Sequence, residues 1–197
     1  HRLIIQLFYP SFSGKHRLAC RRSWWAKFCS GCKEHLPTML CFSHFLLKEG
    51  ARMMIRPIRP ESEPACFPLI RKTFLTFEAP EYPPEGITAF EDFLNDPETI
   101  ARLDFLGAYE SEVLIGVIGW SASQNHICLF FVDEQFQRRG VGKKLWGSLQ
   151  QSFPNTSITV NSSPYSVPFY RHLGFLETSS EQQTDGIRYT PMRYDPD

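Results

Sequence analysis

No stretch of this sequence is long and apolar enough to cross a membrane. The first apolar run, at residues 3–9, is ended by Pro10, and no later run approaches the roughly 18 residues that a spanning helix needs. The chain also has no long apolar segment followed by a small-residue cleavage site, so we expect no secretory signal. These absences predict a cytoplasmic protein in a reducing compartment, without a membrane partner.

The sequence has no net charge, but this zero is the sum of two unlike parts. Residues 1–52 hold nine Lys and Arg against two acids, giving +7, whereas residues 53–197 hold twelve against nineteen, giving −7. The first part also contains four of the six cysteines and shows no sustained helical or alternating pattern. We therefore divide the chain into a basic, cysteine-containing segment at 1–52 and a folded domain at 53–197.

The basic segment allows three interpretations. Its charge alone would permit contact with nucleic acid or with a membrane surface, although we expect neither partner. Its soft ligands could also form a zinc site, but their spacing is too short for a usual finger and few apolar residues remain for a core, so we expect no metal. The residues of that hypothetical site are Cys29, Cys32, His35, Cys41 and His44.

The third interpretation is that the basic segment is disordered, or that it is an upstream stretch outside the natural protein. Lys48, Glu49 and Gly50 can be encoded by AAG GAG GGN, which contains a bacterial ribosome-binding sequence. Met53 and Met54 follow within a few codons, so we expect a bacterial-type translation start there. The genomic DNA upstream of Met53 would test this hypothesis.

From residue 54 onward the hydrophobic pattern becomes regular. Two apolar runs separated by three polar residues at 110–112 indicate an antiparallel hairpin. Helices, then clustered strands, then a return to helix and strand predict an α+β fold rather than a repeated βαβ unit. The expected elements are a strand at 54–58, helices at 61–77 and around 87–94, strands at 103–109, 113–121 and 126–132, a helix after residue 140 and a strand at 158–161.

The most informative stretch is LFFVDEQFQRRGVGKKLW at residues 129–146, in which a buried strand leads through an acidic turn to a helix. Gly140 and Gly142 lack side chains, so the backbone there can approach an anion closely. The free N–H groups of the first helical turn and about half a positive charge from the helix dipole favour phosphate at this point. Arg138 and Arg139 can add whole charges.

Residues 137–142 and two further blocks together resemble the GNAT superfamily of acyl-CoA-dependent N-acyltransferases. Residues 137–142, QRRGVG, match the pyrophosphate motif Q/R-x-x-G-x-G/A, and residues 169–175, FYRHLGF, are similar to the F-Y-x-x-x-G-F segment of that family. The opening MIRPIR at 54–59 is also typical of the first strand. The resemblance implies a central, mixed but mostly antiparallel sheet flanked by helices, with a V-shaped opening between its fourth and fifth strands.

The resemblance also implies acetyl-CoA as the acyl donor, with the pantetheine arm lying along the fourth strand and the pyrophosphate on the glycine loop. Asn161, at the end of the fifth strand, would contact the pantetheine amide or a nearby backbone group. The alternative is that Asn161 only caps or stabilises a turn. The implied cofactor residues are Phe131, Val132, Asp133, Gln137, Arg138, Arg139, Gly140, Val141, Gly142, Lys143 and Asn161.

Two residues are the first catalytic candidates. Tyr170 matches the position at which the family often places its general acid, and His126 matches a position at which some bacterial members place a histidine toward the acceptor. The alternatives are that Tyr170 packs in a short helix and that His126 is a solvated residue at a strand edge. Glu78 and Glu81 are weaker candidates for the base, and we expect Cys128 to be a core residue because GNAT transfer is usually direct.

The sequence does not choose the acceptor. The acidic domain mildly suits a cationic amine such as a polyamine, an aminoglycoside or a peptide amine, and a homodimer is one arrangement the sequence allows. We therefore predict an N-acetyltransferase that works by direct attack in a ternary complex. The alternative from another class is a non-catalytic acyl-CoA sensor, which would bind acetyl-CoA without turnover.

Overall fold

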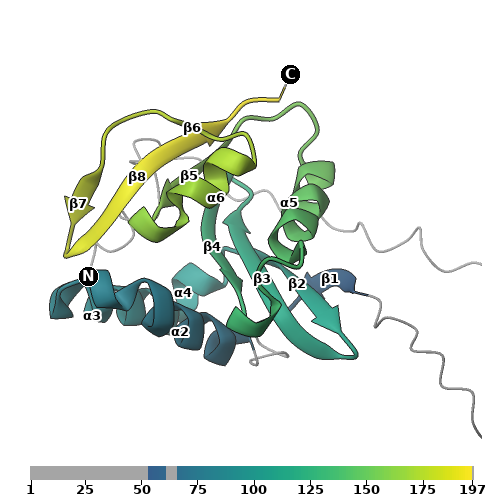
Figure 1. Ribbon diagram of the computed structural model, residues 1–197, viewed down its shortest axis with the longest axis horizontal. Coiled ribbons are helices and arrows are strands. Elements are labelled where there is room, and N and C mark those ends of the chain that lie inside the picture. The colour runs from purple at the N-terminus through teal and green to yellow at the C-terminus, as the bar shows by residue number, and fades with distance from the viewer. Residues whose placement is uncertain (1–52, 61–65, 197) are drawn as a thin grey trace, which may run out of the picture. The chain divides into compact units, whose positions relative to one another are not determined.

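The computed structural model describes residues 53–60 and 66–196 (Figure 1), so the zinc hypothesis and the interpretations of the basic segment lie outside the described residues. Its strands are β1 (Met54–Ile58), β2 (Asp104–Glu110), β3 (Val113–Ser121), β4 (His126–Val132), β5 (Ile158–Ser162), β6 (Leu176–Glu177), β7 (Gln182–Thr184) and β8 (Ile187–Tyr194). Its helices are α2 (Cys66–Phe77), α3 (Pro84–Asn95), α4 (Pro97–Ile100), α5 (Val141–Ser152) and α6 (Val167–His172), with 3-10 turns η1 (Ala79–Glu81), η2 (Glu134–Phe136) and η3 (Pro164–Ser166).

The strands form a mixed sheet in the order β1-β2-β3-β4-β5-β8-β6, with β7 paired to β8 outside this path. All pairs are antiparallel except β4 with β5, which is parallel. This arrangement confirms the predicted α+β class and the mostly antiparallel sheet. None of the helices in the described ranges has the length and apolar character that a membrane span requires.

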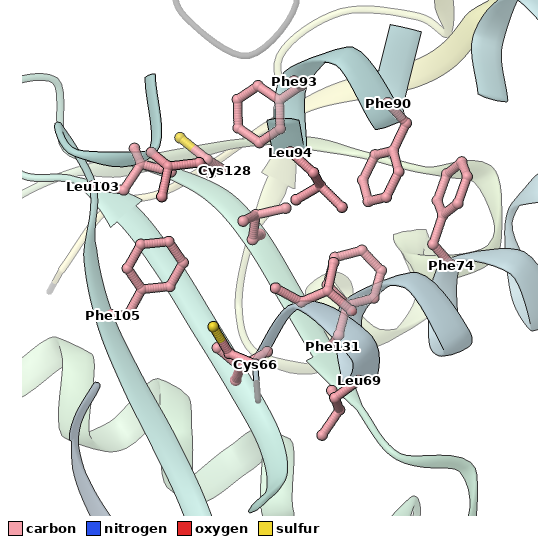
Figure 2. Packing of buried hydrophobic residues seen from close by; sticks show 14 of the residues in the cluster. Cys66, Leu69, Phe74, Phe90, Phe93, Leu94, Leu103, Phe105, Cys128 and Phe131 are labelled. Atoms are coloured by element: carbon pink, nitrogen blue, oxygen red, sulfur yellow. The ribbon is translucent and has the colours of Figure 1, made fainter. Parts of the chain in front are cut away.

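Two hydrophobic cores cover the two faces of the sheet. One core joins α2, α3 and α4 to the sheet, and the other joins α5 and α6 to it. Figure 1 shows α2 and α3 on one side of the central strands and α5 on the other. Figure 2 shows the first core, in which Phe74 and Phe90 lie beside each other and Phe131 projects toward them from β4.

The predicted helix and strand positions agree with the structure at most elements. Strands at 54–58, 113–121 and 126–132 have the predicted bounds, and the predicted 103–109 and 158–161 each differ by one residue. The first helix is described from Cys66 to Phe77, and the predicted part at 61–65 lies outside the described residues. The Glu110–Val113 connection is the predicted hairpin, with Ser111 and Glu112 both at positive φ.

The C-terminal hairpin of β7 and β8 was not predicted. Thr184 pairs with Ile187, so Asp185 and Gly186 form a two-residue turn, and their φ angles of 48° and 79° are left-handed. An Asp-Gly pair between two extended runs is a known hairpin signal, and the sequence carried it. This hairpin matters for function because β8 contributes a wall of the cleft described below.

Candidate active site

The parallel ladder between β4 and β5 is short. In the described sheet it consists of two residue pairs, His126 with Thr159 and Ile127 with Val160. The strands then separate at a bulge in β4, where Gly119 pairs with Leu129 but Trp120 pairs with Ile127, leaving Cys128 as the extra residue. A bulge bends its strand, so it accounts for an opening that begins at this point.

A cleft lies where the two strands diverge, and the empty space there, open solvent included, is about 520 Å³. Residues from α2, α3, β4, β5, α6 and β8 line it, together with residues next to the 3-10 turns. Its walls therefore come from segments that are far apart in the sequence. The residues in its lining that carry polar side chains are Glu78, Tyr82, Cys128, Asn161, Ser162, Ser163, Ser166, Tyr170, Arg188 and Tyr189.

Glu78 is positioned by the end of α2. Its backbone N–H donates to the carbonyl of Phe74 at 2.9 Å, and the residue lines the cleft. Burial raises the pKa of Glu78 to about 7, while the side chain of Ser163 opposes part of the rise and the charge of Glu81 adds to it. A carboxyl with this pKa is ionised in a large fraction of molecules at neutral pH and can still accept a proton.

Tyr170 faces the same cleft from α6. Its ring contacts Phe130, Phe169 and Phe175, with centroids 6.2, 5.6 and 5.3 Å away. Burial raises the pKa of Tyr170 above its ordinary value, and the nearby charge of Glu78 raises it further. The phenol therefore stays protonated at neutral pH, as a proton donor must, and Tyr170 lines the same cleft as Glu78.

Cys128 also lines the cleft but is a poor nucleophile. Burial raises the pKa of its thiol to about 12, so almost none of it is thiolate at neutral pH. The thiol donates a long hydrogen bond of 3.7 Å to the carbonyl of His126. This environment agrees with the expectation that Cys128 packs as a core residue.

His126 is in the short β4–β5 ladder, just before the two strands separate. It is not among the residues that line the cleft. Its side chain is buried, with Nδ1 at 2.8 Å from the Thr159 hydroxyl. Burial lowers the pKa of His126 to about 4, so the ring is neutral at physiological pH. The alternative of a solvated edge histidine is not what the structure shows, because the His126 ring is buried and its Nδ1 faces the Thr159 hydroxyl of β5. The catalytic role stays a prediction that this placement does not favour.

The expected phosphate loop connects β4 to α5. Arg138 and Gly140 adopt left-handed backbone angles, with φ of 60° and 80°, and α5 begins at the next residue, Val141. The first helical hydrogen bond runs from Lys144 N–H to the Gly140 carbonyl, so the N–H groups of 141–143 point out of the helix end. Such a helix start is suited to an anion.

Gly142 is required by packing as well as by the motif. A Cβ at this position would lie 2.8 Å from Cζ of Phe169, a ring that stacks edge-on against Phe130 at 5.2 Å. The phosphate loop and the second GNAT-like block are therefore in direct contact. Two sequence motifs that lie 27 residues apart, at Gly142 and Phe169, form one site.

The other predicted cofactor residues follow the edge of the cleft. Phe131 and Asn161 line it, from β4 and β5 respectively, and Val132 accepts a hydrogen bond of 3.2 Å from the side chain of Gln137. Asp133 caps η2 and forms an ion pair with Lys72 of α2 at 2.8 Å.

Three basic residues surround the start of α5. Arg139 lies 3.9 Å from Glu110 and 4.9 Å over the ring of Phe136, while Arg138 and Lys143 are exposed. These side chains are therefore available to an anion at the phosphate loop.

Sequence reasoning did not predict that residues next to η1 and residues of β8 line the cleft. Tyr82 follows η1, and its hydroxyl donates to the carbonyl of Arg188 at 3.1 Å, which joins the two segments. Arg188 and Tyr189 belong to the hairpin that was not predicted, so nothing connected them with the cleft. The described residues contain no group of His, Cys, Asp and Glu that could hold a metal ion.

Comparisons with known proteins identify the class. The acetyltransferase (GNAT) domain family matches residues 78–196, which is more than half of the chain, so the chain belongs to this family. It is an acyltransferase of the GNAT superfamily, as the sequence motifs predicted. No curated protein matches the sequence significantly.

Solved structures share the fold at low sequence identity. A GCN5-related N-acetyltransferase from Rhodopseudomonas palustris is 19% identical with a TM-score of 0.63, covering 78% of this chain and 100% of that one. The PaiA N-acetyltransferase from Thermoplasma acidophilum, solved with coenzyme A, is 19% identical with a TM-score of 0.58 and coverages of 74% and 99%. The ribosomal-protein-S18-alanine N-acetyltransferase from Escherichia coli is 14% identical with a TM-score of 0.51 and coverages of 73% and 94%.

Proposed function

We propose that this protein transfers an acetyl group from acetyl-CoA to a primary amine by direct attack in a ternary complex, with residues 53–197 as its catalytic domain. The observation that carries this proposal is the placement of Glu78 and Tyr170 on one cleft, at the point where β4 and β5 separate and next to the start of α5. One group can accept a proton at neutral pH and the other can donate one.

The cofactor would extend along the cleft from the phosphate loop. The N–H groups at the start of α5 and the basic residues Arg138, Arg139 and Lys143 suit the pyrophosphate, and the edge of β4 at 131–133 suits the pantetheine arm. The β5 ladder has ended at Ile127, and at 132 the carbonyl on this side accepts from the side chain of Gln137, which the arm would have to displace or share. Asn161 on the facing strand would contact the arm from the other side.

The chemistry then requires two proton transfers. The amine nitrogen attacks the thioester carbonyl carbon, a C–N bond forms and the C–S bond breaks. The Glu78 carboxylate accepts a proton from the attacking nitrogen, and the Tyr170 hydroxyl gives a proton to the departing thiolate sulfur. Glu78 replaces His126 as the preferred base, because Glu78 lines the cleft and His126 does not.

The experiment is an assay of thiol release by the purified full chain with acetyl-CoA and a broad set of amines. We expect turnover, a loss of about 100-fold in kcat for Glu78→Gln and of about 10-fold or more for Tyr170→Phe. Tyr194→Phe is the control for the tyrosine, because its ring packs in the core of α5 and α6. Glu85→Gln controls for the carboxylate, because Glu85 is exposed on α3 and does not line the cleft.

Two results would contradict the proposal. Binding of acetyl-CoA without acetylation of any amine would favour the sensor. Full activity in both Glu78→Gln and Tyr170→Phe would refute the assigned roles while leaving the family membership intact.

A further inference from the structure

The side chain of Ser163 does not do what its position in the chain offers. Ser163 follows β5 directly and is the N-cap of the 3-10 turn η3, where a serine hydroxyl commonly accepts a hydrogen bond from the turn. Here the hydroxyl makes no capping bond. The backbone carbonyl of Ser163 is the acceptor instead, from the N–H of Ser166 at 3.0 Å and from the hydroxyl of Ser162 at 2.9 Å.

The Ser163 hydroxyl is a buried polar group with an unmet hydrogen bond. Ser163 is 8% exposed, and none of the described residues forms a hydrogen bond with its Oγ. The hydroxyl opposes the rise in the pKa of Glu78, but the two side chains do not reach hydrogen-bond geometry. The large majority of buried hydroxyls in proteins are hydrogen-bonded. Ser163 lines the cleft, so its hydroxyl can meet a bound group there by rotation about χ1.

Other hydroxyls in the wall of the cleft are already engaged. Tyr82 and Ser162 donate to backbone carbonyls at 3.1 and 2.9 Å, and Tyr189 donates to a side-chain carbonyl at 3.1 Å. Tyr170 has the proposed role of protonating the thiolate. Ser163 therefore brings a buried and uncommitted donor to the described lining of the cleft.

The acyl transfer contains a charge to which no group has yet been assigned. When the amine nitrogen attacks, the C–N bond forms and one electron pair of the carbonyl moves onto its oxygen. The resulting oxyanion persists until the pair returns and the C–S bond breaks. Glu78 serves the nitrogen and Tyr170 the sulfur, whereas the oxyanion needs a hydrogen-bond donor, which is most effective where water is excluded.

We propose that the hydroxyl of Ser163 donates a hydrogen bond to the thioester carbonyl oxygen of acetyl-CoA and to the oxyanion that forms from it. This inference rests on the proposed function and adds a third group to its chemistry. The hydroxyl keeps its proton throughout, so the two proton transfers assigned to Glu78 and Tyr170 are unchanged.

The test compares Ser163→Ala with Ser163→Thr, which keeps a hydroxyl. Thiol release from acetyl-CoA by the full chain is followed with the best amine of the broad set. We expect kcat to fall at least about tenfold in Ser163→Ala, because an oxyanion donor acts mainly in the transition state. The KM values and the midpoint of the pH profile should stay near those of the parent protein, and Ser163→Thr should keep kcat within about threefold.

Ser121→Ala is the matched control. Ser121 is also buried, at 1% exposed, but its hydroxyl lies 3.1 Å from that of Ser123 and the residue does not line the cleft. In urea unfolding the control should be less stable than the parent protein while its kcat is unchanged. Ser163→Ala should show the reverse, because its hydroxyl has no hydrogen bond to lose in the folded protein.

Calorimetry with CoA and with acetyl-CoA gives a readout that does not depend on turnover. CoA lacks the acyl oxygen, so Ser163→Ala should leave CoA binding unchanged and weaken acetyl-CoA binding about 2- to 5-fold. Equal weakening for both ligands would assign the hydroxyl to another part of the cofactor and overturn the inference.

Three kinetic results would also overturn it. A kcat in Ser163→Ala that stays within threefold of the parent would remove the role in the transition state. A shifted pH midpoint with unchanged kcat at high pH would mean that the hydroxyl serves Glu78, and a higher KM for the amine alone would mean that it binds the acceptor. If the parent releases no thiol with any amine, the proposed function fails, whereas a loss of binding confined to acetyl-CoA would still support the contact with the acyl oxygen.

Discussion

Phe77, the last residue of α2, stacks on Tyr165 of η3, with ring centroids 5.1 Å apart and planes at 21°. The hydroxyl of Tyr165 reaches the side chain of Gln137 at 3.5 Å, and Gln137 in turn donates to the Val132 carbonyl. Tyr165 therefore connects three segments around the cleft. These are the end of α2, the turn after β5 and the phosphate loop.

Replacing Tyr165 should weaken cofactor binding more than it weakens the fold. The side chain is 46% exposed, so Tyr165→Ala should lower stability little, but the walls of the cleft would lose their connection. Loss of an aromatic pair of about 0.5–1.5 kcal/mol predicts about 2- to 10-fold weaker CoA binding, measured by calorimetry. Tyr165→Phe keeps the stack and should bind CoA almost as the parent does. Equal loss in both variants would assign the effect to the hydroxyl and contradict this prediction.

The raised pKa of Glu78 predicts opposite effects of pH on activity and on stability. Activity should rise with pH through about 7, because the ionised carboxylate is the base. Stability should fall over the same change, since the folded pKa lies above the unfolded value near 4.5. The stabilisation that the protonated Glu78 carboxyl contributes is complete below pH 4.5 and is lost as pH rises through about 7. Its magnitude is on the order of 3 kcal/mol.

The variant Glu78→Gln separates these effects. It should lose the rise in kcat/KM near pH 7. The stability of the variant minus that of the parent protein should be larger at pH 8 than at pH 5. Urea unfolding at the two pH values measures the stability difference, with Glu85→Gln as the control. A stability difference that is the same at pH 5 and pH 8 would show that Glu78 titrates at its ordinary pKa.

Gly142 and Gly140 should respond differently to substitution. Gly142→Val forces a side chain against the ring of Phe169, which costs about 1–3 kcal/mol and displaces the block that faces the phosphate loop. We expect at least tenfold weaker CoA binding. Gly140→Ala meets nothing within 4 Å and introduces only the strain of its left-handed φ, about 1 kcal/mol of stability.

A second substitution tests the cause. Phe169→Leu removes the atoms that a Cβ at Gly142 would meet, so the double variant should recover part of the stability lost in Gly142→Val. Denaturant midpoints of the single and double variants give this comparison. A double variant less stable than either single one would place the damage elsewhere.

The sequence drew attention to the residues around the start of α5, but not to those that η1 and β8 contribute to the cleft. The residues at 137–142 are adjacent in the chain, and glycine and arginine there have backbone and charge properties that a short motif can express. Tyr170 was found through a second local motif. The structure adds that Gly142 and Phe169 touch, which no single motif contains.

The walls of the cleft near η1 and β8 depend on contacts between distant segments, which is why the sequence missed them. Tyr82 and Arg188 meet across 106 positions of the chain, and neither belongs to a motif. Glu78 was a weak candidate because its pKa results from burial, and a sequence does not show burial. The burial of His126 was not visible in the sequence for a similar reason, since its hydrogen-bond partner Thr159 is 33 residues away on another strand.

The buried ring of His126 predicts a loss of stability in mild acid. Because burial lowers its pKa to about 4, below the ordinary value of 6.5, the unfolded chain binds more protons between these values. The contribution of His126 is complete above pH 6.5 and is lost as pH falls toward 4, on the order of 3 kcal/mol. His126→Gln should therefore show a smaller loss of stability between pH 7 and pH 4.5 than the parent protein, although its stability at pH 7 should be lower.

Urea unfolding at pH 7 and pH 4.5 measures this difference, and His172→Gln is the control because His172 is exposed on α6. The carboxylates titrate equally in parent and variants, so the comparison isolates the histidine. Equal acid sensitivity in His126→Gln and the parent would mean that the ring can be protonated in the folded state. That result would return His126 to consideration as a proton acceptor, since a base must be able to bind a proton without unfolding the strand that carries it.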